Sequence, residues 1–167
     1  MVDDPHGAYL DHQAGPRIPS PVRRAMEQAL DLTGDPDALH DWGRAPAAAV
    51  EQARERVARL IGARPEEIIF TSGAVESRNL AVKGTLGARA RDGGHVVASM
   101  MEHAATLSAC RTATRRTGGL SMVAAGPTGA GSPADLRQAL REDSVLVCLT
   151  HAQAAIGTVA DLGPLIA

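Results

Sequence analysis

Short apolar runs rich in β-branched residues alternate along the sequence with longer segments of helical periodicity, and this alternation limits the possible folds. A strand, a helix and a second strand in succession are typical of a parallel sheet, because the chain must return to the same end of the sheet before the next strand begins. Strands covered by helices on both faces need no polar alternation. Four runs are predicted to be strands: residues 68–70, 95–99, 120–124 and 144–150. The sequence therefore predicts an α/β fold of alternating helices and mostly parallel strands.

Helices are predicted between these strands at residues 22–30, 46–61, 74–86, 107–116 and after Ser132-Pro133. Ser20 is expected to cap the first of them, and Gly62 to end the second. The helix over 46–61 is the clearest amphipathic segment, since Val50, Val57 and Leu60 recur at helical spacing. The whole element is expected to be structural.

Composition excludes several classes of function. With 167 residues the chain is long enough for one domain with a sizeable core, and only 2% of its residues are aromatic, so that core must consist of small aliphatic side chains. The net charge of −2 does not favour nucleic acid as a partner. No apolar run is long enough to span a membrane, and residues 1–7 do not resemble a secretory signal, so a cytoplasmic location is expected.

Cys110 and Cys148 are the only cysteines. Two cysteines do not form a disulfide framework, and their spacing matches no metal-binding motif, so no metal site is predicted. Cys110 falls in a predicted helix and Cys148 in a predicted strand. Both are expected to be small core side chains.

The candidate site begins at residues 71–75, where a predicted strand leads into a helix through small residues. The first backbone N–H groups of a helix have no partner inside it, so such a turn can hold an anion, although many α/β domains bind nothing there. His103 and residues 151–155 also follow predicted strands directly. Ligands of parallel sheets bind at the carboxyl ends of the strands, so these three segments are expected to meet at one edge.

Residues 71–84 read TSGAVESRNLAVKG and resemble the T-S-G-A-T-E-S-x-N-L-A-x-K-G run of cysteine desulfurases, which belong to the class V aminotransferase family with the fold type I architecture. The resemblance covers nearly the whole chain. Residues 9–16 are similar to the family's Y-L-D-x-x-A-T-T segment, and residues 34–43 to its G-N-P-S-S-x-H-x-x-G segment. It implies that residues 1–20 form an N-terminal arm, and residues 21–167 the N-terminal portion of a large domain truncated at its C-terminal end.

The resemblance also implies pyridoxal phosphate (PLP) as cofactor. Gly73, Ala74 and Val75 match the turn that holds its phosphate, and His103 matches the histidine that stacks on its pyridine ring. Ala154 stands where an asparagine of the family binds the ring hydroxyl, and Ala155 replaces a glutamate. Val75 replaces a threonine, and a lost hydrogen bond to a charged group costs about 1.5–3 kcal/mol.

The sequence contains one lysine, Lys83, which is predicted to be a solvated residue of the helix after the turn. The resemblance places the Schiff-base lysine, the pyridinium aspartate, the persulfide cysteine and the substrate-binding arginine beyond residue 167, so no residue of this chain is assigned a catalytic role. In the family, sulfur passes from L-cysteine to an enzyme persulfide and alanine is released.

Two functions are therefore weighed. The first is a truncated or split cysteine desulfurase-like chain, inactive alone, that depends on a homo-oligomer or a complementing C-terminal half and could serve a sulfur-acceptor protein. The second is a non-catalytic interaction or regulatory module, which the substitutions at Val75, Ala154 and Ala155 favour. A third hypothesis, an α/β domain that binds another phosphorylated ligand at residues 72–75, ranks last. Missing strands are expected to expose apolar surface and cause self-association.

Overall fold

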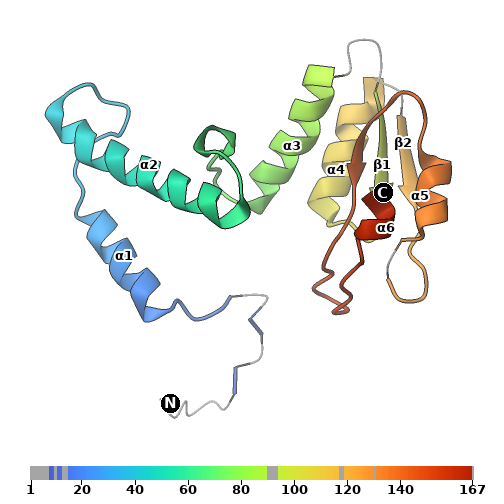
Figure 1. The fold of residues 1–167 in the computed structure, drawn as a ribbon, viewed down its shortest axis with the longest axis horizontal. Helices are drawn as coiled ribbons and strands as arrows, with labels where there is room; N and C mark the ends of the chain where they lie inside the picture. Colours follow the sequence, from blue (N-terminus) through green and yellow to red (C-terminus); the bar gives the residue numbers. More distant parts are fainter. Residues whose placement is uncertain are drawn as a thin grey trace. The chain divides into compact units, whose positions relative to one another are not determined.

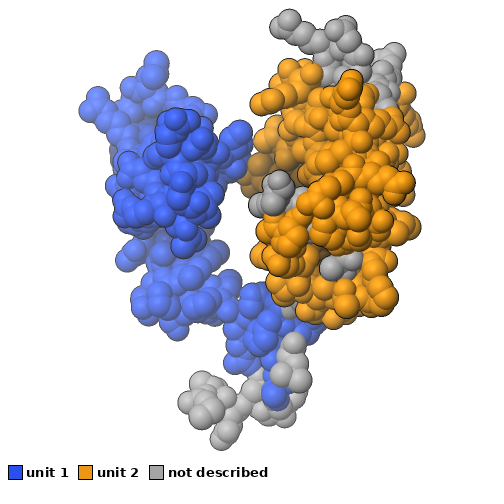
Figure 2. Space-filling view, turned by 45° about the vertical axis from the view of Figure 1, so that its right-hand side comes forward, with its two compact units in different colours: residues 1–70 blue, residues 71–167 orange. Residues whose placement is uncertain are grey.

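The computed structural model describes residues 8–9, 11–12, 15–89, 94–116, 119–129 and 131–166. The chain divides into two compact units, residues 1–70 and residues 71–167, coloured blue and orange in Figure 2. Figure 1 labels the helices and strands.

The first unit consists of helix α1 (Ser20–Leu30), helix α2 (Asp41–Ile61) and the short 3-10 helix η1 (Pro65–Glu67). Gly62 ends α2 in the left-handed conformation, with φ of 69°, as predicted. Helix α2 begins before the predicted residue 46, so that Pro46 lies inside it. The Ser20 prediction is wrong by one position, because Pro19 is the N-cap of α1 and no side chain caps this helix.

Within the first unit, the apolar face of α2 is largely uncovered. Leu60 is 85% exposed and Ile61 64% exposed, and the buried residues of the helix are Gly43, Pro46 and Ala58. An amphipathic pattern shows that one face of a helix is apolar, but it does not specify the surface that covers that face.

Residues 68–70 are not a strand, so this prediction is wrong as well. Ile68 has extended backbone angles, but Ile69 and Phe70 are 68% and 48% exposed, and none of the described strands pairs with them. A strand exists only through hydrogen bonds to a neighbour. Arg54 contacts the segment instead: its Nη1 donates to the Ile68 carbonyl oxygen at 2.6 Å, and its guanidinium lies 5.0 Å from the centre of the Phe70 ring.

The second unit is an α/β layer that confirms the predicted fold class. Its elements are helix α3 (Ala74–Arg89), strand β1 (His95–Ser99), helix α4 (Ala104–Ala113), the 3-10 helix η2 (Thr114–Arg116), strand β2 (Gly119–Val123), helix α5 (Pro133–Ala139), strand β3 (Ser144–Cys148) and helix α6 (Gly163–Ile166). The three strands are parallel, in the order β2-β1-β3.

The core lies on both faces of the central strand β1, all of whose residues are buried. Val96 packs in one cluster with Val82 and Leu86 of α3 and with Ala109 and Cys110 of α4. Its neighbour in sequence, Val97, packs in a second cluster with Val123 of β2 and Leu136 of α5. Because successive side chains of a strand point to opposite faces, helices cover both sides of the sheet, as Figure 1 shows.

A buried histidine joins the three strands. His95, which begins β1, is fully buried, and its Nδ1 lies 2.7 Å from Ser144 Oγ of β3. Its Nε2 lies 2.8 Å from Ser121 Oγ of β2. Burial, and secondarily the charge of Arg141, lowers the pKa of His95, so the ring is held in its neutral form. Sequence reasoning did not assign a role to this residue.

Within the described part of the chain, no helix combines the length and hydropathy needed to cross a bilayer. The same residues contain no cluster of three or more histidine, cysteine or carboxylate side chains that could hold a metal ion.

Candidate functional site

The turn at the start of α3 presents unpaired backbone donors. The first backbone hydrogen bond of the helix runs from Ser77 N to the Gly73 carbonyl oxygen at 3.0 Å. Among the described residues, no acceptor pairs with the N–H groups of Gly73, Ala74 or Val75. Three adjacent free donors at the positive end of a 16-residue helix form a seat for an anion.

Side chains around the turn hold it in place. Thr71 Oγ1 lies 2.6 Å from Ser77 Oγ. Ser72 donates both its backbone N–H and its hydroxyl to Glu76 Oε2, each at 2.6 Å, and these bonds lower the pKa of the Glu76 carboxyl. The turn is therefore ordered by its own hydrogen bonds and does not need a ligand to shape it.

The seat is also open. No protein atom beyond the chain neighbours of Gly73 lies within 4 Å of the point where a Cβ on that residue would stand. Val75 is 58% exposed and offers only methyl groups where a hydroxyl could donate to a bound anion. Space and backbone donors are present, and the side-chain donor is missing.

His103 is the N-cap of α4. Its Nδ1 accepts a hydrogen bond from the backbone N–H of Ala105 at 3.0 Å, and its carbonyl oxygen accepts from Thr106 and Leu107. An Nδ1 that accepts cannot carry a proton, so the proton of the neutral ring is on Nε2. Helix α4 begins at Ala104, three residues before the predicted start at residue 107. The start was missed because histidine is not among the preferred N-cap residues.

Two polar contacts join the segments that follow β1 and β3. Thr150 Oγ1 donates to Glu102 Oε1 at 2.9 Å, and Gln153 Nε2 donates to the Met101 carbonyl oxygen at 3.3 Å. The segment with His103 and the segment 151–155 therefore meet at one edge of the sheet, as expected from sequence. These two contacts were not predicted. The sequence does show that each of the polar residues follows the end of a predicted strand, and this position could have indicated them.

The turn at the start of α3 lies at the same end of the second unit as the segments that follow β1 and β3. Helices α3 and α4 pack side by side, and each begins at the end of the sheet where β1 and β3 finish (Figure 1). Within the described residues no hydrogen bond joins the turn at 71–75 to the other two segments. Ala154 and Ala155 follow Gln153, whose Oε1 accepts from Ala155 N at 2.7 Å. Lys83 is exposed on α3, as predicted.

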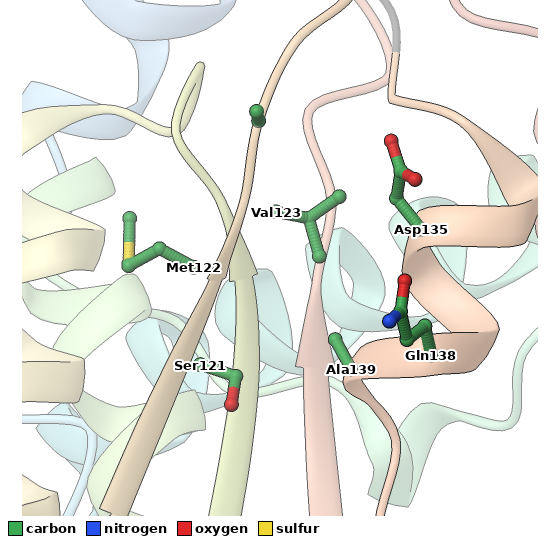
Figure 3. Close-up of a pocket in the computed structure, with 7 residues that line it drawn as sticks. Ser121, Met122, Val123, Asp135, Gln138 and Ala139 are labelled. Atoms are coloured by element: carbon green, nitrogen blue, oxygen red, sulfur yellow. The ribbon is translucent and has the colours of Figure 1, made fainter.

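A cavity of about 380 Å³ lies elsewhere, between β2 and α5 (Figure 3). Asp135 and Gln138 of α5 and Ser121 to Ala124 of β2 and its exit line it. It contains none of the predicted site residues, and Asp135 is its single carboxylate.

The fold and the strand-end site define a class of protein, the fold type I architecture of PLP-dependent enzymes. Two solved structures share this arrangement: a NifS-like protein (TM-score 0.86, 26% identity, 95% of this chain and 44% of that one) and SspA in complex with cysteine (TM-score 0.86, 30% identity, 94% of this chain and 46% of that one).

The family model for class-V aminotransferases matches residues 8–167, and the chain belongs to this family. The cysteine desulfurase IscS of Dictyoglomus turgidum is 38% identical over 152 residues, which are 90% of this chain and 39% of that protein. The IscS of Azotobacter vinelandii is 38% identical over 158 residues, 92% of this chain and again 39% of the relative. The chain thus spans about two fifths of the length of these relatives, at their N-terminal side, and is cysteine desulfurase-like.

Proposed function

We propose that this chain supplies the phosphate-binding and ring-stacking half of a PLP site in a cysteine desulfurase-like protein, and that a further polypeptide segment completes the site. The single observation that carries the proposal is the open turn at the start of α3, with three free N–H groups at residues 73–75. A phosphate matches that seat in charge and in its need for donors.

His103 fits the second role. Its ring is oriented by the cap bond to Ala105, and the Glu102–Thr150 bond ties its segment to the exit of β3. An imidazole held in one orientation at the same end of the sheet can stack on a flat heteroaromatic ring. When bound, PLP acts as an electron sink for the carbon atoms of an amino acid, and the protein contributes binding and orientation.

The remaining positions do not complete the site. The side chain of Ala154 cannot form a hydrogen bond with a ring hydroxyl, and Lys83 is exposed on α3, eight residues or more from the seat at 73–75. We therefore expect the lysine that anchors the cofactor and the cysteine that accepts sulfur to come from a complementing segment, either in the same polypeptide or in another subunit. The chain alone, given PLP and L-cysteine, should release neither alanine nor sulfide.

The proposal is tested by equilibrium dialysis of the purified chain against PLP, with Val75→Asp as the decisive variant. An aspartate at the start of a helix favours the helix, so this variant should fold, yet its carboxylate repels a phosphate from the seat. Ala81→Asp is the matched control, because it places the same charge on an exposed position of the same helix, about 9 Å further along.

Saturable binding at one PLP per chain, weakened at least about tenfold by Val75→Asp and unchanged by Ala81→Asp, supports the proposal. Equal affinities for the two variants, or no saturable binding, would overturn it. Borohydride reduction followed by peptide mapping adds a second test. A stoichiometric adduct on Lys83 would contradict the assignment of the anchoring lysine to another segment.

A second candidate function, a non-catalytic interaction or regulatory module, is favoured by the lost polar groups at Val75, Ala154 and Ala155. This module would keep the α/β layer without binding the cofactor. Absence of PLP binding by a chain that unfolds cooperatively would support it.

A further inference from the structure

The two cysteines lie next to each other in the core of the second unit, although 38 positions separate them in sequence. The Cys110 and Cys148 sulfur atoms are 3.9 Å apart and form a hydrogen bond between α4 and β3. Both were predicted to be core side chains, and both belong to the apolar cluster of Val82, Leu86 and Val96. Their proximity was not predicted.

The pair differs in access to solvent. Cys110 is fully buried, whereas Cys148, the last residue of β3, is partly exposed. Strand β3 stands at one end of the order β2-β1-β3. Because the described residues contain no group of three metal-binding side chains, the pair has no third ligand there and is better described as a dithiol than as part of a metal centre.

The hydrogen bond makes the two thiols unequal. The bond from Cys148 lowers the pKa of Cys110. The same bond, together with burial and the charge on Cys110, raises the pKa of Cys148. The hydrogen bond therefore favours the thiolate form of Cys110 over that of Cys148.

We propose that Cys110 and Cys148 are a redox site, at which a small peroxide converts the dithiol to a reversible disulfide that links α4 to β3. One thiolate of the pair attacks one oxygen of hydrogen peroxide, the O–O bond breaks, and a sulfenic acid and, after protonation, water are formed. The other thiol then attacks that sulfur, the S–O bond breaks, and a second water leaves as the S–S bond forms. Two thiols and one peroxide thus give one disulfide and two waters.

For the disulfide to form, the two sulfur atoms must approach from 3.9 Å to a bonding distance of about 2.05 Å.

The disulfide would connect the two elements that carry the strand-end segments. Helix α4 begins beside His103, and β3 leads to Thr150, which already bonds Glu102 across the same gap. Oxidation would therefore restrict relative movement of α4 and β3. This inference does not depend on cofactor binding.

The test uses the full chain treated with hydrogen peroxide and then unfolded in the presence of an alkylating reagent. We expect loss of both free thiols, a decrease in intact mass equal to two hydrogen atoms, and one cross-linked peptide pair containing residues 110 and 148. Dithiothreitol should restore both thiols, and the oxidised chain should melt at a higher temperature than the reduced chain.

Cys148→Ala is the control, because the partly exposed position tolerates a small side chain. This variant should form no internal cross-link. Three results would overturn the proposal: disulfides only between chains, oxidation of wild type to sulfinic acid without a cross-link, or two intact thiols under conditions that oxidise free cysteine. Wild-type protein alone distinguishes these outcomes, so the test does not depend on the folding of the variant.

Discussion

The substitution His95→Ala removes the side chain that joins all three strands of the sheet. The imidazole of His95 lies 2.7 Å from Ser144 Oγ and 2.8 Å from Ser121 Oγ, and the residue is fully buried. These partners belong to β3 and β2, on either side of β1. Loss of the ring therefore weakens both strand pairs at once.

The expected loss of stability follows from these contacts. Each of the two hydrogen bonds contributes about 1 kcal/mol net, so their loss costs about 2 kcal/mol. Loss of the buried ring adds about 1–2 kcal/mol of lost packing. Ser144 Oγ also accepts a hydrogen bond from Arg141 N at 2.8 Å, so it keeps a partner in the variant. No free-energy cost of a buried, unpaired hydroxyl is therefore added for Ser144. The sum is about 3–4 kcal/mol, a large share of the 5–15 kcal/mol typical of a domain.

Urea denaturation followed by far-ultraviolet circular dichroism measures this loss. Trp42 fluorescence is unsuitable, because Trp42 lies in the first unit and is 70% exposed. His151→Ala is the matched control, since it deletes an exposed histidine from the same unit and should change the free energy of unfolding little. A loss below about 1 kcal/mol for His95→Ala, or equal losses for the two variants, would refute the reasoning.

The pH dependence gives an independent check. The pKa of His95 in the folded chain is lowered from 6.5. Between the folded pKa and 6.5, the unfolded chain therefore binds a proton at His95 and the folded chain does not. Stability should therefore rise with pH from the folded pKa up to about 6.5, and level off above it. His95→Ala should remove this part of the slope, and an unchanged slope would show that another group causes it.

Three further results are expected. Val75→Thr should tighten PLP binding about 10- to 100-fold in equilibrium dialysis, since it restores one donor to a charged ligand; unchanged affinity would remove Val75 from the seat. A carbon-13 titration should give the Glu76 carboxyl a pKa below 4.5, and Ser72→Ala should move it back toward that value. The disulfide between Cys110 and Cys148 closes a loop of 38 residues and should add about 4 kcal/mol to the free energy of unfolding; no gain would indicate strain in the bond.

Elements that depend on neighbours in sequence could be predicted. The runs at 95–99, 120–124 and 144–150 form β1, β2 and β3, and the parallel arrangement follows from the helices between them. Gly62 and Ser132 are helix caps, as predicted. Caps can be predicted from sequence because a capping residue interacts only with the adjacent turn of its own helix. The turn at 71–75 was likewise recognised from a local feature, small residues at a helix start.

One prediction that needed a distant partner failed. Residues 68–70 have the composition of a strand, yet no described strand pairs with them. The spacing of apolar residues identified the apolar face of α2, but it does not specify what packs against that face. Propensity and periodicity describe a segment, and they do not specify its neighbour.

The amino-acid sequence by itself determined the class of fold, the position of the small-residue turn at 71–75 and the family resemblance. Only the tertiary structure brought His95 between Ser121 and Ser144, and Cys110 beside Cys148. These partners are 26 to 49 positions apart, and the strand order β2-β1-β3 makes them neighbours. Strand order is decided by the packing of whole helices and strands, which no local pattern of residues encodes.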